Sequence, residues 1–275
     1  MKTRLTTALL GSALALLALA APAQADELDA IKSRGTLVCG VGSNYIPFSY
    51  VEDQQTRKMV GYDVDLCEAV ARKIGVKPDF KFITAATRVP EVQQGRVDVV
   101  LASVTITPER EQLISFSYPH LVNGTSVITP AGKPIKAFSD LDGKRVAVTE
   151  GGTTGPAVSR VIPGARPIGF PTPATAFMAL GQGKVQAMAA DETALVGLMR
   201  AEPGKFVMFD QHLVTEKMGI GVRKDQPQLL AVVNQTLLDL EKSGQAQAIW
   251  DRWFGADSPL KRPRTFKFEA PAGSN

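Results

Sequence analysis

The sequence is poor in the residues and motifs that carry most enzyme chemistry. Its 275 residues include two cysteines and two histidines, and His120 and His212 lack the close spacing of a metal site. No glycine-rich loop closes with Gly-Lys-Ser/Thr, and no Gly-x-Ser-x-Gly turn occurs. These absences argue against nucleotide binding, a metal site and a serine nucleophile. We therefore expect neither a cofactor nor a catalytic residue.

An excess of one charge is also missing. The chain has 31 basic and 27 acidic residues, and no basic run alternates with aromatic side chains. Nucleic-acid binding has little support from this pattern. The basic cluster 261–264 lies in a proline-containing tail, where we expect a solvated end of the chain.

Long apolar runs are absent beyond the N-terminus. Lys2 and Arg4 precede the apolar run 9–21, and Ala23-Gln24-Ala25 has the small-x-small pattern of a cleavage site. The run is short for a membrane span. We predict a signal peptide over residues 1–25, cut after Ala25, and an exported protein.

Short β-branched runs and amphipathic helices alternate along the remaining chain. In residues 64–74, for example, apolar side chains recur at the i, i+3, i+4, i+7 spacing of one buried helix face. This alternation predicts an α/β fold with mostly parallel sheets flanked by helices. The expected strands are 37–41, 79–83, 97–103, 145–149, 168–170, 185–189 and 206–209, and the expected helices between them are 64–74, 87–95, 153–161, 174–180 and 192–200.

The alternation is interrupted at residues 129–134, a segment rich in proline and glycine, and then restarts. A short internal sequence similarity relates residues 94–99 to residues 182–187. In each segment the end of an expected helix is followed by a glycine, a basic residue and an expected strand. We therefore expect two similar lobes joined by two crossings. Lobe 1 would comprise residues 26–128 plus 221–275, and lobe 2 residues 129–220.

The segment 101–119 presents hydroxyl groups at a strand end, followed by an arginine. Ser103, Thr105 and Thr107 precede Arg110, whose planar guanidinium and neighbouring hydroxyls suit a carboxylate. A solvated helix face would also explain Arg110, which lies between two glutamates.

Other candidates follow strands in the same way. Asp191 fits a helix N-cap or a carboxylate that faces a ligand ammonium, and Thr153 belongs to a glycine turn that fits an N-cap or an anion site. Tyr45 fits a cavity wall or ordinary packing. Arg88, at a helix start, fits a surface position or a ligand contact.

Cys39 and Cys67 lie on an expected strand and on the helix that follows. A disulfide between them is sterically plausible in an oxidising compartment. Two buried thiols are the alternative.

Several segments, taken in order, resemble the periplasmic amino-acid-binding proteins of ABC importers, solute-binding family 3, and within it the glutamate/aspartate-binding branch. The resemblance covers residues 28–254. It is carried by P-F-S-Y at 47–50, G-Y-D-V-D-L at 61–66, I-T-A-A-T-R-V-P at 83–90, S-V-T-I-T-P-E-R at 103–110, F-S-Y-P at 116–119 and the glycine turn 149–154.

The resemblance implies a two-lobed periplasmic-binding-protein fold of type II, with two hinge crossings, that closes on one amino acid. It implies a monomer that delivers its ligand to an ABC membrane permease. By position, Arg110, Thr105 and the turn containing Thr149 and Thr153 would bind the α-carboxylate. Ser103 and Asp191 would hold the ammonium, and Tyr45 would line the pocket.

Arg88 would read a side-chain carboxylate in that branch, which favours glutamate or aspartate. The branch typically has an arginine where this chain has Gly42, a histidine near Pro173 and a serine where Ala85 stands. Another polar amino acid therefore also fits. Two further alternatives are an enzyme on the same scaffold, of the cyclohexadienyl dehydratase kind with Glu150 as an acid, and a ligand-presenting partner of a membrane sensor.

Overall fold

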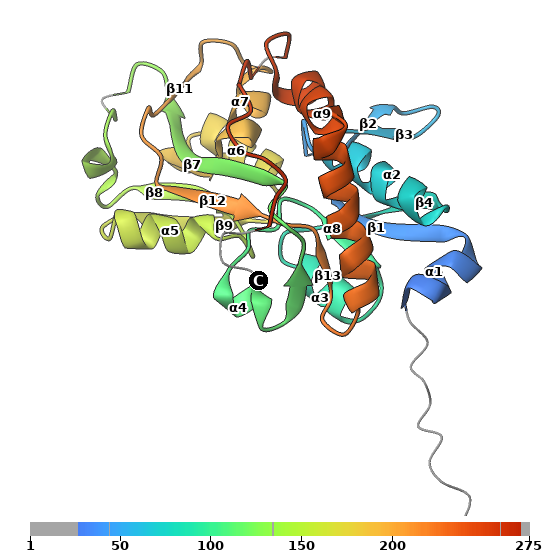
Figure 1. The fold of residues 1–275 in the computed structure, drawn as a ribbon. Helices are drawn as coiled ribbons and strands as arrows, with labels where there is room; N and C mark the ends of the chain where they lie inside the picture. Colours follow the sequence, from blue (N-terminus) through green and yellow to red (C-terminus); the bar gives the residue numbers. More distant parts are fainter. Residues whose placement is uncertain (1–26, 44, 134, 259, 271–275) are drawn as a thin grey trace, which may run out of the picture.

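The structure is a computed structural model that describes residues 27–43, 45–133, 135–258 and 260–270. The predicted signal peptide lies outside these residues. The chain forms two α/β lobes side by side, each built on its own sheet (Figure 1). In the described part of the chain, no helix has the length and apolar character needed to span a bilayer.

The sheet of the first lobe has five strands in the order β4-β1-β5-β13-β6. Their bounds are β4 Lys77–Ile83, β1 Thr36–Gly42, β5 Val99–Leu101, β13 Gly221–Arg223 and β6 Ile114–Phe116. β1 runs parallel to β4 and β5, whereas β13 is antiparallel to both of its neighbours. The helices of this lobe are α1 Glu27–Arg34, α2 Tyr62–Ile74, α3 Arg88–Gln93, α4 Pro108–Glu111, α8 Pro227–Lys242 and α9 Gln245–Phe254.

The sheet of the second lobe has the order β11-β7-β10-β8-β9, with β12 also paired to β7. Its strands are β11 Phe206–Met208, β7 Leu121–Pro130, β10 Ala187–Asp191, β8 Arg145–Thr149, β9 Arg166–Phe170 and β12 Val214–Met218. The helices are α5 Thr154–Val161, α6 Pro173–Gly181 and α7 Glu192–Met199, with the short 3-10 helix η1 at Phe138–Leu141.

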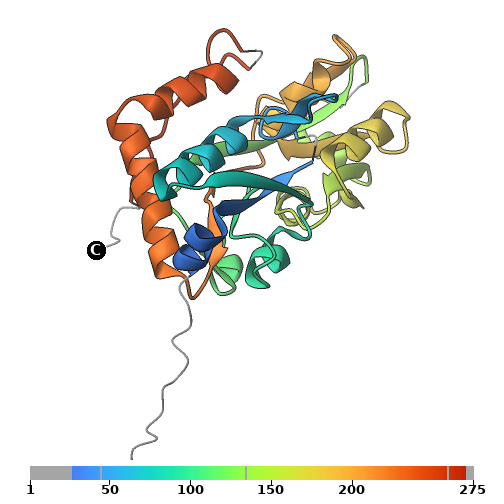
Figure 2. The same cartoon turned by 90° about the vertical axis from the view of Figure 1, so that its right-hand side faces the viewer.

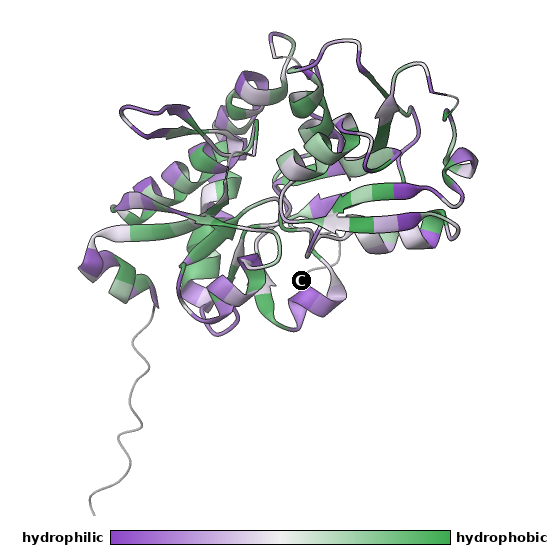
Figure 3. Cartoon of the chain, turned by 180° about the vertical axis from the view of Figure 1, so that it is seen from behind, coloured by the Kyte–Doolittle hydropathy of each residue, from purple (hydrophilic) through white to green (hydrophobic). Residues whose placement is uncertain are grey.

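Alternating side chains bury both faces of each sheet. In β8, Val146 and Val148 belong to the core beneath α5, whereas Ala147 belongs to the core beneath α6 and α7. Successive strand residues point to opposite faces, so a strand covered on both sides needs a continuous apolar run. Figure 3 shows the result as apolar strands inside and polar colours concentrated on outer helices and loops.

Two crossings connect the lobes and run side by side. The Ser117 amide donates to the Ile220 carbonyl at 2.9 Å, and the His120 amide donates to the Met218 carbonyl at 3.0 Å. Because β7 already belongs to the second sheet from Leu121 onward, the first change of sheet lies before that residue, not after residue 128 as the sequence suggested. The glycine- and proline-rich break at 129–134 instead follows the end of β7.

Helices α8 and α9 pack along the outer side of the first lobe, as the view in Figure 2 shows. A small hairpin of β2 Tyr50–Asp53 and β3 Lys58–Val60 lies in the same lobe.

The C-terminal tail is not the solvated end that its basic cluster suggested. Its Arg264 side chain is 4% exposed and pairs with Glu241 on α8, and Phe268 is buried in the core. The Arg262 amide and carbonyl are bonded to Phe254 and Trp250. Arg262 also reaches Glu192 on α7 of the second lobe, at 2.6 Å.

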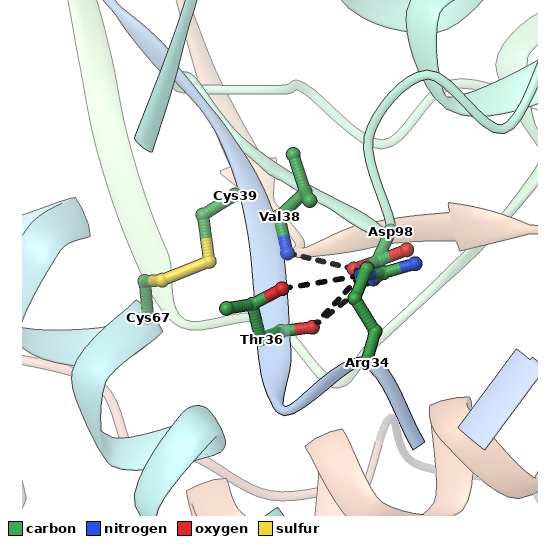
Figure 4. Close-up of a disulfide and its surroundings, with 6 residues drawn as sticks. All are labelled: Arg34, Thr36, Val38, Cys39, Cys67 and Asp98. Atoms are coloured by element: carbon green, nitrogen blue, oxygen red, sulfur yellow. Dashed lines mark hydrogen bonds and ion pairs between the residues drawn. A yellow bond between two sulfur atoms is a disulfide. The ribbon is translucent and has the colours of Figure 1, made fainter. Parts of the chain in front are cut away.

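The predicted disulfide is confirmed. Cys39 on β1 and Cys67 on α2 are bonded, with their Cα atoms 6.5 Å apart (Figure 4). On the same strand the Val38 amide donates to the Asp98 carboxylate at 2.7 Å, and Arg34 pairs with that carboxylate. The disulfide therefore links α2 to β1, and the carboxyl end of β1, at Gly42, borders the site described below.

Candidate ligand-binding site

A cavity lies between the lobes, where the carboxyl ends of parallel strands from both sheets face each other. Ligands of open α/β sheets bind at such strand ends, because the loops there leave backbone groups and side chains unpaired. The first lobe contributes Gly42, Ser43, Tyr45, Ile83, Thr84, Ala85, Arg88, Ala102, Ser103 and Thr105. The second lobe contributes Thr149, Gly152, Thr153, Thr154, Pro171, Thr172, Pro173, Ala190 and Asp191.

All of the ligand residues predicted from the sequence line this cavity except Arg110. The same lining contains Gly42, Ala85 and Pro173, the positions at which the chain departs from the glutamate/aspartate-binding branch. The structure therefore brings the predicted positions together from widely separated segments of the chain.

Tyr45 and Asp191 bridge the lobes directly. The Tyr45 hydroxyl donates to Asp191 Oδ2 at 2.7 Å. Burial, and then the charge of Asp191, raise the pKa of Tyr45 well above its ordinary value, so the phenol keeps its proton. Burial raises the pKa of Asp191 to about 6, although the bond from Tyr45 acts in the opposite direction. A ligand ammonium at this carboxylate would stabilise the charged form of Asp191, which burial disfavours.

Ser103 offers a hydroxyl with no competing bond. Its Oγ is buried and has no hydrogen-bond partner among the described residues, and its φ of 50° lies in the left-handed region. A non-glycine residue there carries a backbone cost that functional sites often retain. The free hydroxyl and the strain both fit a ligand contact.

Arg88 is a buried cation without an ion pair in the described part of the chain. Arg88 is 5% exposed, and its Nη1 donates hydrogen bonds to the Ala102 and Ser103 carbonyls at 2.7 and 2.8 Å. Burial, and then the charge of Arg110, lower its pKa to about 10, so it remains charged at neutral pH. Its Nε is buried and unbonded within the described residues. An acceptor atom of a ligand would satisfy this guanidinium.

Arg110 lies beside the cavity and spans the lobes. Its Nη1 donates to the Thr105 carbonyl at 2.9 Å and its Nη2 to the Gly151 carbonyl at 3.1 Å. Burial lowers its pKa, and the charge of Glu216 opposes that effect. Arg110 is half-buried, so the alternative of a freely solvated helix face does not describe it.

Glu216 is a member of the site that the sequence analysis missed. Its Oε2 accepts a bond from the Thr153 hydroxyl at 2.8 Å and one from the Thr105 hydroxyl at 3.4 Å. The sequence predicts no strand over the segment V-T-E-K-M around it, and nothing in its pattern links it to the cavity. Its proximity follows from the second crossing, which pairs Met218 with Thr105.

The expected helix caps are not formed by side chains. Asp191 and Thr153 occupy the N-cap positions of α7 and α5, but neither makes a side-chain capping bond. Their polar atoms instead bind Tyr45 and Glu216. Glu150, the acid considered for an enzyme, is exposed and is not among the cavity-lining residues.

Comparison with known proteins shows the family of the chain. The family described as "Bacterial extracellular solute-binding proteins, family 3" matches residues 37–256. The chain belongs to this family. Within the family, the L-cystine-binding protein TcyJ of Escherichia coli (strain K12) is 30% identical, over 85% of this chain and 88% of that protein. The glutamate/aspartate import solute-binding protein of the same strain is 32% identical, over 88% of this chain and 84% of that protein.

Solved structures confirm that this family 3 protein has the type II periplasmic-binding-protein fold. A P235GK mutant of ArgBP from T. maritima superposes with a TM-score of 0.77 at 32% identity, covering 82% of this chain and 98% of that one. The ancestral amino-acid-binding protein AncCDT-1, described as a precursor of cyclohexadienyl dehydratase, gives a TM-score of 0.77 at 33% identity. That match covers 83% of this chain and all of the other chain, at 100%.

Proposed function

We propose that this protein binds one amino acid between its lobes and delivers it to an ABC permease. The observation that carries the proposal is the cavity itself, which is lined by Asp191 from one lobe and by the buried Arg88 from the other. An amino acid has both an ammonium and a carboxylate, so it can interact with charged groups of both lobes at once. The relatives named above, which bind amino acids by name, support this assignment.

The α-carboxylate is expected at Arg110 and at the start of α5. Arg110 already bonds Thr105 and Gly151, one in each lobe, so a carboxylate that replaced a carbonyl acceptor would join the lobes through a charged pair. Amides at a helix start attract anions as well. Ser103 and Asp191 would bind the ammonium, and Arg88 would bind an acceptor on the side chain. Glutamate, aspartate and other polar amino acids have such an acceptor.

We also propose that the protein is a periplasmic monomer, exported with the signal peptide 1–25. Closure around the ligand would follow hinge motion at the paired crossings, as in other hinged binding proteins. Mass spectrometry of the exported protein should show a chain that begins at Asp26.

Calorimetry with a panel of amino acids tests the binding role. The protein should first be unfolded and refolded to remove any ligand that co-purifies, and mass spectrometry of that ligand would identify it. Arg110→Ala should abolish binding because a buried carboxylate would lose its partner. Arg96→Ala, which removes an exposed arginine paired with Glu91, is the matched control and should bind normally. If no amino acid in the panel gave a binding signal, the proposed function would be refuted.

The enzyme alternative has no acid in the described cavity lining apart from Asp191, which faces Tyr45. We propose binding without turnover. A sensor that receives the loaded protein would use the same cavity and the same closure, so it would not change the ligand chemistry.

A further inference from the structure

Glu216 adds a carboxylate to the site without lining the cavity. It lies on β12, immediately before the second crossing, and contacts two threonines that do line the cavity. Thr153 and Thr105 belong to different lobes, and their hydroxyl oxygens are 3.5 Å apart. Glu216 therefore lies behind the place where the two lobes meet.

The bonds to Glu216 decide what the threonines offer a ligand. A hydroxyl has one proton, and a carboxylate can only accept. The Thr153 hydroxyl donates its hydrogen bond to Glu216 at 2.8 Å, so only its lone pairs are left for a ligand. While this hydrogen bond is formed, Thr153 cannot donate to a ligand carboxylate. The sequence-based role for Thr153 in a carboxylate shell is weakened accordingly.

Glu216 also changes the charge balance around the cavity. Its charge opposes the lowering of the pKa of Arg110 and of Arg88 by burial, and it adds to the rise in the pKa of Asp191. Burial raises the pKa of nearby Asp63 well above its ordinary value and so disfavours the charged form of that carboxyl. The guanidiniums of Arg88 and Arg110 are thus opposed by the carboxylates of Asp191 and Glu216.

We propose that Glu216 sets the charge class of the ligand and favours an amino acid with no net charge over one with a second carboxylate. The proposal rests on the proposed function. With two cationic and two anionic groups, the site balances a zwitterion, whereas a second ligand carboxylate would add an uncompensated charge. Arg88 can still donate to a neutral acceptor such as a side-chain amide.

Matched pairs of ligands test the proposal. Calorimetry should compare glutamine with glutamate, and asparagine with aspartate, on the wild type and on Glu216→Gln. Removing the carboxylate should raise affinity for the acid relative to its amide by about tenfold, the size of one charge interaction at an intermediate dielectric. Glu216→Asp keeps the charge and should leave the ratio unchanged. Glu202→Gln, at a surface ion pair with Lys205, removes the same charge far from the site and should also leave it unchanged.

The outcomes distinguish a failure of charge selectivity from a failure of amino-acid binding. If the acid-to-amide ratio stays constant in Glu216→Gln, Glu216 does not set charge selectivity and the proposal is overturned, while amino-acid binding stands. If Glu216→Gln does not fold, the wild type decides: its tightest ligand should carry no net charge, and an anionic tightest ligand overturns the proposal. If no amino acid binds the wild type, the proposed function fails first.

Discussion

A methyl group at Gly151 should prevent closure of the cleft. Gly151 belongs to the turn before α5 in the second lobe and faces the 84–87 loop of the first. A Cβ at this position would lie 2.4 Å from the Cα of Ala86 and 2.7 Å from its amide nitrogen. Both opposing atoms are backbone, so no side chain can move aside. The predicted effect of Gly151→Ala is a protein that folds but binds its ligand weakly.

The magnitude follows from the distances. Ordinary carbon contacts begin at 3.4 Å, so the lobes must separate by about 1 Å at this point. Arg110 bonds the Gly151 carbonyl at 3.1 Å, and Tyr45 bonds Asp191 across the same cleft at 2.7 Å. Loss of one charge-assisted bond costs roughly 1.5 to 3 kcal/mol. Affinity should therefore fall about ten- to hundredfold.

Calorimetry measures the affinity, and Gly183→Ala supplies the control. Gly183 has a φ of 70°, close to the 72° of Gly151, but a Cβ there would meet nothing within 4 Å. Both substitutions therefore carry a similar backbone cost of about 1 to 2 kcal/mol, which thermal unfolding would register. Only Gly151→Ala should lose ligand. Equal affinities in the two variants would refute the contact between Gly151 and Ala86 as a feature of the bound state.

Two further predictions concern pH and the disulfide. The pKa of Asp191 is about 6 in the free protein, and a bound ammonium would lower it, so protonation competes with the ligand. Affinity should fall about tenfold between about pH 7.5 and about pH 5, and Asp191→Asn should bind weakly with little pH dependence; constant wild-type affinity in calorimetry would contradict this. Replacing Cys39 and Cys67 by serine should lower the free energy of unfolding by roughly 3 to 4 kcal/mol, because the bridge closes a loop with a sequence separation of 28. Chemical denaturation checks this loss, and equal stability of the oxidised and double-serine proteins would rule it out.

The fold was predictable because both faces of each sheet are buried. That burial produces continuous apolar runs such as 146–148, which lies within β8, and periodic helices such as 192–200, which appears as α7. Elements without such a pattern were missed, among them the β2–β3 hairpin and the edge strand β12. The strand expected at 97–103 is shorter, at Val99–Leu101, since the backbone turns at Ser103 into the left-handed region.

The lining of the cavity was predictable where a polar residue directly follows a strand. Asp191 and Ser103 come at the carboxyl ends of buried strands, and strand ends meet at the cleft. Glu216 could not be found in this way, because its place depends on the pairing of the second crossing with Thr105. The prediction of a solvated C-terminal tail was wrong for a related reason, because the ion-pair partner of Arg262 lies far away in the sequence, on α7 of the other lobe.

The bridge between Cys39 and Cys67 has a practical consequence for measuring closure. The sequence contains no other cysteine, so the native protein offers no thiol to a maleimide dye. A thiol introduced by Ile46→Cys would be the single labelling position. Ile46 is 42% exposed, and its carbonyl lies opposite Gly197 on α7. A solvent-sensitive dye there would lose water contacts as the lobes approach, so its emission would report ligand capture in real time.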